Sequence, residues 1–137
     1  MNKRVYILSL LLVSLLLIAA SCEKVNSYPK NSIEGTWRCF ENIGLNSPRD
    51  YNVQINYYNP DDSTEITLLN LYNLGYEFEV LATVEDTTIT LYYTNSLNND
   101  ITGIGHFTRD YNVIYWELSY FGNAGSDPNI EAFFRRP

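Results

Sequence analysis

The stretch "YNVQINYY", residues 51–58, alternates between two sets of side chains along its whole length. The side chains expected to face a core are Tyr51, Val53, Ile55 and Tyr57. The side chains between them are Asn52, Gln54, Asn56 and Tyr58. A period of two is typical of a β-strand with one buried face and one wet face. The stretch therefore predicts an antiparallel sheet.

Seven further runs of similar composition surround this one. They are rich in Tyr, Thr, Ile, Phe and Val, which favour strands, and the residues between them are those that turns use. No window shows a 3.6-residue apolar period. The eight expected strands are residues 36–43, 50–58, 64–73, 76–85, 87–95, 101–109, 113–121 and 130–136. The longest expected connection between them is "GNAGSDPN", residues 122–129.

Short connections favour pairing between strands that are neighbours in the sequence. A meander of eight such strands has two exposed edges, and closing the sheet removes them. We therefore expect an all-β fold, an eight-stranded antiparallel up-and-down barrel, with a β-sandwich as the alternative. The residues expected to point inward are Tyr51, Ile55, Tyr57, Phe78, Ala82, Leu91, Tyr93, Gly103, Gly105, Phe107, Trp116, Tyr120, Ala132 and Phe134.

Large rings dominate this inward set, which predicts a small and mostly filled interior. Gly103 and Gly105 have two interpretations. They either make room for Trp116 or open a pocket.

The first expected strand follows "IEGTW", residues 33–37, and the last lies in "NIEAFFRRP", residues 129–137. A Gly-x-Trp at the start of strand one resembles the calycin signature of lipocalins and fatty-acid-binding proteins. The resemblance implies a lipocalin-like barrel closed at one end by Trp37, beside Gly35. It also implies that Arg135 or Arg136 lies across the indole, a packing that suits a guanidinium.

The chain is also similar to small lipocalin-like lipoproteins of certain Gram-negative bacteria. The segments that carry this likeness are "ITLLNLYNLG" and "ITGIGHF", followed by a tyrosine-rich strand. The likeness implies a compartment and a fold, and it implies no chemistry.

The first residues have the layout of a secretory signal peptide. Lys3 and Arg4 precede 16 mostly apolar residues, 5–20, which are fewer than the roughly 20 needed to span a membrane. The segment ends in "AASC", where Cys22 resembles the lipidated cysteine of the bacterial lipobox, although that motif prefers Leu at the position of Ala19. A plain signal peptide is the alternative.

The lipobox resemblance implies cleavage before Cys22 and attachment of acyl chains such as palmitate, which together anchor a protein stably. We therefore expect a signal peptide at 1–21, a lipidated tether at 22–32 and a lipocalin-like barrel domain at 33–137. Glu23, where inner-membrane lipoproteins have Asp, favours the outer membrane of a Gram-negative bacterium.

Removal of residues 1–21 leaves 116 residues with seven basic and 16 acidic side chains, a net charge of −9. Such a domain is a poor partner for nucleic acid or for anionic headgroups. Once Cys22 carries lipid, Cys39 has no disulfide partner and is expected to be a buried apolar residue. We expect no cofactor.

Other polar residues give no site of recognisable chemistry. His106 is the sole histidine, with no nucleophile or carboxylate at a catalytic spacing beside it. Asp61, Asp62 and Glu65 lie at an expected turn and lack the pattern of a calcium loop. We therefore expect no metal and no catalytic residue.

The outward-facing tyrosines Tyr58, Tyr92 and Tyr111 are suited to stacking on sugars, and equally to a structural role in strands. The sequence thus predicts a non-enzymatic cell-envelope lipoprotein that binds a small apolar or glycan ligand. The alternative is a solid barrel that docks another envelope component.

Overall fold

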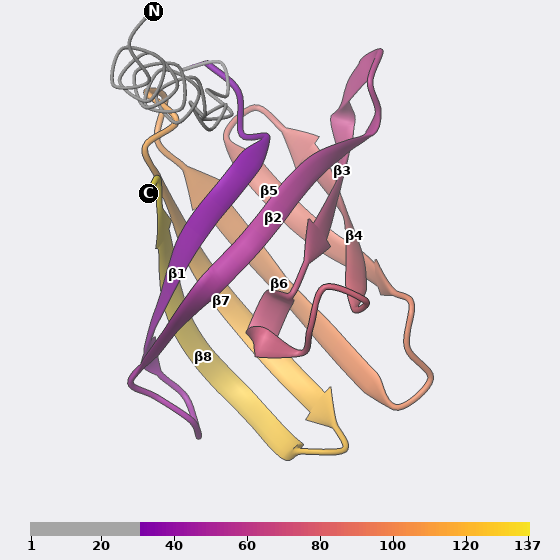
Figure 1. Ribbon diagram of the computed structural model, residues 1–137, viewed down its shortest axis with the longest axis vertical. Helices are drawn as coiled ribbons and strands as arrows, with labels where there is room; N and C mark the ends of the chain where they lie inside the picture. The colour runs from indigo at the N-terminus through magenta and orange to yellow at the C-terminus, as the bar shows by residue number, and fades with distance from the viewer. Residues whose placement is uncertain (1–30) are drawn as a thin grey trace, which may run out of the picture.

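A computed structural model describes residues 31–137, which form a closed barrel of eight antiparallel strands in up-and-down order (Figure 1). Each strand pairs with its sequence neighbours, and β1 also pairs with β8. The elements are β1 (Gly35–Ile43), β2 (Arg49–Asn59), β3 (Asp62–Leu69), η1 (Leu71–Asn73), β4 (Glu79–Glu85), β5 (Thr88–Thr94), β6 (Asn99–Phe107), β7 (Val113–Gly122) and β8 (Gly125–Arg135). The barrel expected from the sequence is confirmed, and the β-sandwich alternative is wrong.

The predicted signal peptide, residues 1–21, and Cys22 lie outside the described residues, as does most of the tether at 22–32. Ser32, at the end of that predicted tether, is buried. Its hydroxyl shares a hydrogen bond of 2.9 Å with the Tyr57 hydroxyl. Ser32 is therefore packed as part of the barrel domain.

The strand expected at 64–73 ends early, at Leu69, and the next one begins only at Glu79. Asn70 and Tyr72 have φ values of 65° and 58°, which a β-strand does not tolerate. After Asn70 the chain turns inward as the short 3-10 helix η1, which contains Tyr72, and this segment lies across one end of the barrel (Figure 1).

The connection expected at 122–129 is also wrong, because Gly122 and Gly125 already pair across a tight β7–β8 hairpin. Pro128 lies inside β8, where the register shifts by one residue between the Leu118 and Tyr120 positions of β7. A bulge tolerates a proline, which has no N–H to donate to the ladder.

One inward prediction fails on β5. Leu81 pairs with Tyr93 and Ala82 pairs with Leu91, so Tyr92 is an extra residue in that strand. A bulge reverses the phase of the side chains that follow it. Tyr93 therefore points outward and is 54% exposed, beside an equally exposed Tyr92.

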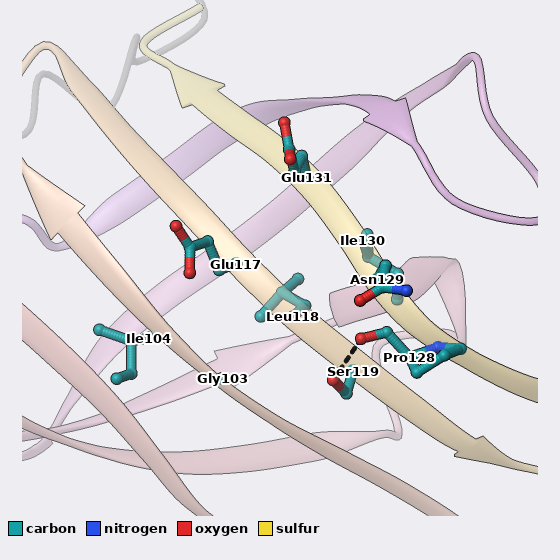
Figure 2. A pocket seen from close by; sticks show the side chains of 9 residues that line it. All are labelled: Gly103, Ile104, Glu117, Leu118, Ser119, Pro128, Asn129, Ile130 and Glu131. Atoms are coloured by element: carbon teal, nitrogen blue, oxygen red, sulfur yellow. Dashed lines mark hydrogen bonds between the residues drawn. The ribbon is translucent and has the colours of Figure 1, made fainter.

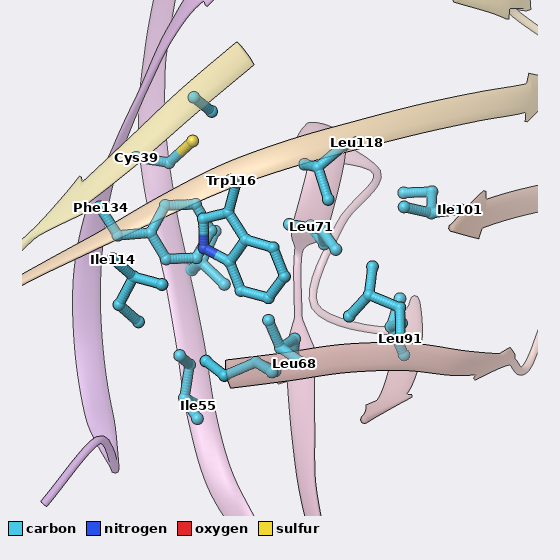
Figure 3. Close-up of a cluster of buried hydrophobic side chains, with 14 of the residues drawn as sticks. Cys39, Ile55, Leu68, Leu71, Leu91, Ile101, Ile114, Trp116, Leu118 and Phe134 are labelled. Carbon is cyan, nitrogen blue, oxygen red and sulfur yellow. The ribbon is translucent and has the colours of Figure 1, made fainter. Parts of the chain in front are cut away.

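The remaining large inward side chains fill the barrel (Figure 3). The ring of Trp116 packs at 5.4 Å, centroid to centroid, against Phe134. A Cβ atom on Gly105 would lie 2.9 Å from three atoms of the Trp116 ring, and one on Gly103 would lie 2.3 Å from the Glu117 carbonyl oxygen. Both glycines therefore make room for β7, and neither opens a pocket in the interior.

Candidate functional site

One end of the barrel is closed by Trp37, which is fully buried. Its indole Nε1 donates to the carbonyl of Ile33 at 2.8 Å. The guanidinium carbon of Arg136 lies 4.0 Å from the ring centroid, and Arg136 also donates to the carbonyls of Ser32 and Glu34. We call this the closed end.

Arg135, the other arginine that the sequence offered for this role, points elsewhere. Its guanidinium carbon lies 4.9 Å from the ring centroid of Phe133, on the outside of the barrel. Gly35 begins β1 with a φ of 125°, a conformation that residues with a side chain rarely adopt. The closed end is thus a packing arrangement in which the Trp37 indole and the Arg136 guanidinium are both hydrogen-bonded to backbone carbonyls.

The opposite end, which we call the mouth end, carries the connections at 44–48, 70–78, 95–98 and 123–124. Leu71 and Tyr72 of η1 are buried there. The Tyr72 ring stacks on Tyr120 with centroids 4.3 Å apart. Side chains from η1 therefore occupy the place where a lipocalin-like barrel would admit a ligand.

An ion pair between the buried Glu41 and the partly exposed Arg49 lies beneath η1, which plugs the mouth end. Glu41 is 2% exposed and accepts from Arg49 Nε and Nη2, the latter at 3.1 Å. Arg49 also lies 4.3 Å from the Tyr72 ring centroid and donates to the Tyr72 carbonyl at 3.1 Å. The Tyr51 hydroxyl donates to Glu41 at 3.1 Å, and burial is the main reason that the pKa of Tyr51 is raised. The hydroxyl therefore remains a donor.

A second buried carboxylate, Asp127, joins three parts of the mouth end. It accepts from the backbone N–H of Leu45 at 2.8 Å and from the Tyr72 hydroxyl at 3.0 Å. Asn46 in turn donates to the Tyr72 hydroxyl at 3.1 Å. These groups satisfy one another, as buried polar groups generally must, so the cluster holds η1 in place.

This cluster was not predicted from the sequence, although the sequence contains part of the signal for it. Glu41 lies in the same strand phase as Trp37 and Cys39, and Arg49 lies in the phase of Tyr51. A carboxylate and a guanidinium in the inward phase at adjacent strand ends predict a buried pair. Nothing in the local sequence indicates that Asp127 would join them.

The outer wall has a shallow hollow of about 320 Å³ over β6, β7 and β8 (Figure 2). Glu117 and Glu131 stand opposite each other on paired strands beside it. The Ser119 hydroxyl donates to the Pro128 carbonyl at 2.8 Å. Two carboxylates make an incomplete metal site, and residues 31–137 contain no group of three His, Cys, Asp or Glu side chains able to hold a metal ion.

The other polar residues singled out in the sequence remain apart. His106 is exposed, with Nδ1 3.2 Å from the hydroxyl of Thr88. Asp62 accepts from Thr64 within its own turn, and Glu65 accepts from the Tyr92 hydroxyl. The structure brings none of them together as a site.

A second hollow, of about 480 Å³, lies at the rim of the mouth end. It lies between the 95–98 connection and the β7–β8 hairpin. Its lining residues are Thr94, Ser96, Leu97, Asn98, Asn99, Asp100, Phe121, Gly122 and Asn123. We call it the rim hollow. It combines exposed apolar side chains with amides, and the sequence did not indicate it because two segments that lie far apart in the chain form it.

No protein-family model, no curated protein and no solved structure matches this chain. In the part of the chain that the structure describes, no helix has the length and apolar character needed to cross a membrane. The function is therefore inferred from the geometry of the barrel and its two ends.

Proposed function

We propose that this protein is a non-enzymatic lipoprotein of a Gram-negative outer membrane, and that it binds its partner on the outside of a solid barrel. The observation that carries the proposal is the insertion of Leu71 and Tyr72 into the mouth end. An eight-stranded barrel is either filled by its side chains or holds one small ligand. Because Leu71 and Tyr72 occupy the mouth end, the structure favours a barrel that is filled by its own side chains.

The cost of opening the barrel supports the same conclusion. A fatty acid or haem entering through the mouth end would have to displace η1. That movement would break the contacts of Tyr72 with Arg49, Asp127 and Tyr120. Leaving a buried carboxylate without its partners costs several kcal/mol, which a small apolar ligand would have to offset.

The proposed anchor on Cys22 would favour the mouth end as the end that meets a partner. Ser32, the second residue that the structure describes, contacts Arg136 at the closed end, so the described part of the chain begins there. Residues 23–31 span at most roughly 30 Å when extended. Lipids on Cys22 would hold the closed end toward the membrane, with the mouth end directed away from it.

A non-enzymatic function is supported by the way the buried polar groups are used. Glu41 and Arg49 bond each other, and Asp127 bonds Leu45 and Tyr72. Catalysis requires a nucleophile, base or metal within reach of a substrate. Each of these groups is instead held by its neighbours beneath η1.

Two measurements test the proposal. Intact mass of the membrane-extracted full chain should show an N-terminal, triacylated Cys22, and a Cys22→Ser variant should leave the membrane fraction. Thermal shift assays with palmitate and haem should show no stabilisation, whereas a ligand at one hundred times its Kd adds about 2.7 kcal/mol. Saturable palmitate or haem binding that quenches Trp116 fluorescence would overturn the solid barrel.

A further inference from the structure

We infer that the rim hollow is a binding site for an uncharged glycan. This inference rests on the proposed function, because it takes the outside of the barrel as the binding surface and names the ligand class. The hollow lies at the mouth end, opposite the closed end where Ser32 contacts Arg136.

Two exposed apolar side chains flank the hollow. Phe121 at the end of β7 is 71% exposed, and Leu97 in the β5–β6 connection is fully exposed. An aromatic face in water is costly to leave uncovered, and it matches the apolar C–H face of a pyranose ring. Phe121 and Leu97 therefore form an apolar platform beside polar groups, and a sugar can contact both, because its ring has an apolar face and hydroxyl groups at its edge.

The floor of the hollow is rigid. The backbone N–H of Asn123 donates to the Asn98 carbonyl at 3.2 Å, so the two loops are joined directly. Below them the Tyr120 hydroxyl donates to Asn99 Oδ1 at 2.6 Å and accepts from the N–H of Ala124 at 3.1 Å. A site already held in one conformation loses less entropy on binding than a flexible loop does.

Gly122 shows how closely the two loops approach. A Cβ atom at this position would lie 2.6 Å from the Asn98 carbonyl oxygen and from Asn99 Oδ1. No side chain fits there. Glycine thus keeps the backbone of the hairpin against the 95–98 connection, and the hollow retains its shape.

Polar groups that lack partners surround this floor. The side chains of Asn98, Asp100 and Asn123 make no hydrogen bond within residues 31–137. An amide both donates and accepts, and a carboxylate accepts, so together they match the hydroxyl groups of a sugar. The bonded side chain of Asn99, by contrast, is part of the floor.

Charge at the mouth end selects against anionic ligands. Its four connections, 44–48, 70–78, 95–98 and 123–124, contain no Lys or Arg, and their one acidic residue is Glu77. The same segments contain six asparagines. Anionic polysaccharides, phospholipid headgroups and nucleic acids require basic residues. A neutral, hydroxyl-rich ligand is the class that fits.

The experiment uses the mature chain with Cys22→Ser and isothermal titration with neutral hexasaccharides: maltohexaose, cellohexaose, xylohexaose and mannohexaose. At least one should bind with a Kd between 10 µM and 1 mM, a range of about −7 to −4 kcal/mol. Phe121→Ala and Asn123→Ala should each weaken that binding at least fivefold. Tyr115→Ala, which removes another exposed ring of β7 from the outer wall, is the matched control and should leave Kd unchanged.

Several results would overturn the inference. The first two are a failure of all four hexasaccharides to bind and binding that survives Phe121→Ala. The third is tighter binding of polygalacturonate than of any neutral hexasaccharide. The fourth is attachment to phosphatidylcholine vesicles through Phe121 in place of a sugar. Equal melting temperatures of the variants would show that the fold is intact, since the side chains are exposed. These failures leave the solid barrel standing, because only a ligand inside the barrel contradicts it.

Discussion

The guanidinium carbon of Arg136 lies 4.0 Å from the ring centroid of Trp37, so the end of the chain covers the start of the first strand. The same guanidinium donates to the carbonyl of Glu34 at 2.8 Å. One side chain therefore satisfies backbone acceptors and covers an indole at the closed end. Arg135 makes none of these contacts.

The two neighbouring arginines should differ strongly in their effect on stability. Arg136→Ala should lower the free energy of unfolding by about 2–3 kcal/mol, because it removes a cation–π contact and leaves carbonyl groups without donors. Arg135→Ala, which removes an exposed guanidinium beside the half-buried Phe133 ring, should cost under about 1 kcal/mol. Urea denaturation measures both, and equal losses would show that the closed end does not depend on Arg136.

The two tryptophans provide a second matched pair. Trp37 Nε1 donates to Ile33, whereas Trp116 Nε1 is buried and has no partner within the described residues. Both Trp→Phe changes lose side-chain volume, but only Trp37→Phe also leaves the Ile33 carbonyl without its donor. Trp37→Phe should therefore cost about 1–3 kcal/mol more than Trp116→Phe. An equal or larger loss at Trp116 in chemical denaturation would argue against this account.

The buried Glu41–Arg49 pair should show strong coupling. Arg49→Met leaves a charged Glu41 in the core and should cost about 3–5 kcal/mol. Adding Glu41→Leu should recover part of that loss, giving a coupling energy of roughly 1–3 kcal/mol in a double-mutant cycle.

The exposed pair Arg38–Asp50 is the control for that cycle. Solvent screens an ion pair whose two side chains are nearly half exposed, so its coupling should stay below about 1 kcal/mol. A Glu41–Arg49 coupling no larger than this would mean that the plug at the mouth end is not held by the ion pair.

Cys39 should make stability depend on alkaline pH. Burial, the largest cause, raises the pKa of its thiol to about 12, while an unfolded cysteine titrates near about 8.5. Between these values only the unfolded chain loses the proton. The contribution of the protonated Cys39 thiol to the free energy of unfolding is therefore complete below about pH 8.5, and it is lost as the pH rises toward 12.

The difference between wild type and Cys39→Ala in urea unfolding isolates this effect from that of Tyr51. Between pH 7.5 and pH 10 the wild type should lose about 2 kcal/mol more than the variant does. Parallel pH profiles would mean that Cys39 ionises in the folded barrel. Iodoacetamide labelling of Cys39 should likewise follow global unfolding.

Much of the barrel could be predicted from local sequence. Alternation such as that of Val53 and Ile55 with their polar neighbours determines which face of a strand is buried, because successive side chains point to opposite faces. Short connections then place each strand beside the next. The calycin resemblance, carried by Trp37 in the first strand and the arginines at the end of the last strand, also allowed contact between the indole and Arg135 or Arg136 to be expected.

The arrangement of residues at the mouth end could not be predicted without the tertiary structure. The bulge at Tyr92, the Pro128 position inside β8 and the left-handed turn at Tyr72 are each allowed by the local sequence without being demanded by it. Which conformation forms depends on what the neighbouring strands contact.

The sequence by itself determined a β-rich chain with period-two strands and an order in which they pair. Only the tertiary structure decided that the mouth end is filled and that Leu97 and Phe121 lie at one hollow. Asp127 reaches Leu45 across 82 residues, and Tyr120 bonds Asn99 across 21. Strand phase is a property of adjacent residues, whereas contacts over such separations exist only once the closed sheet brings its loops together at one end.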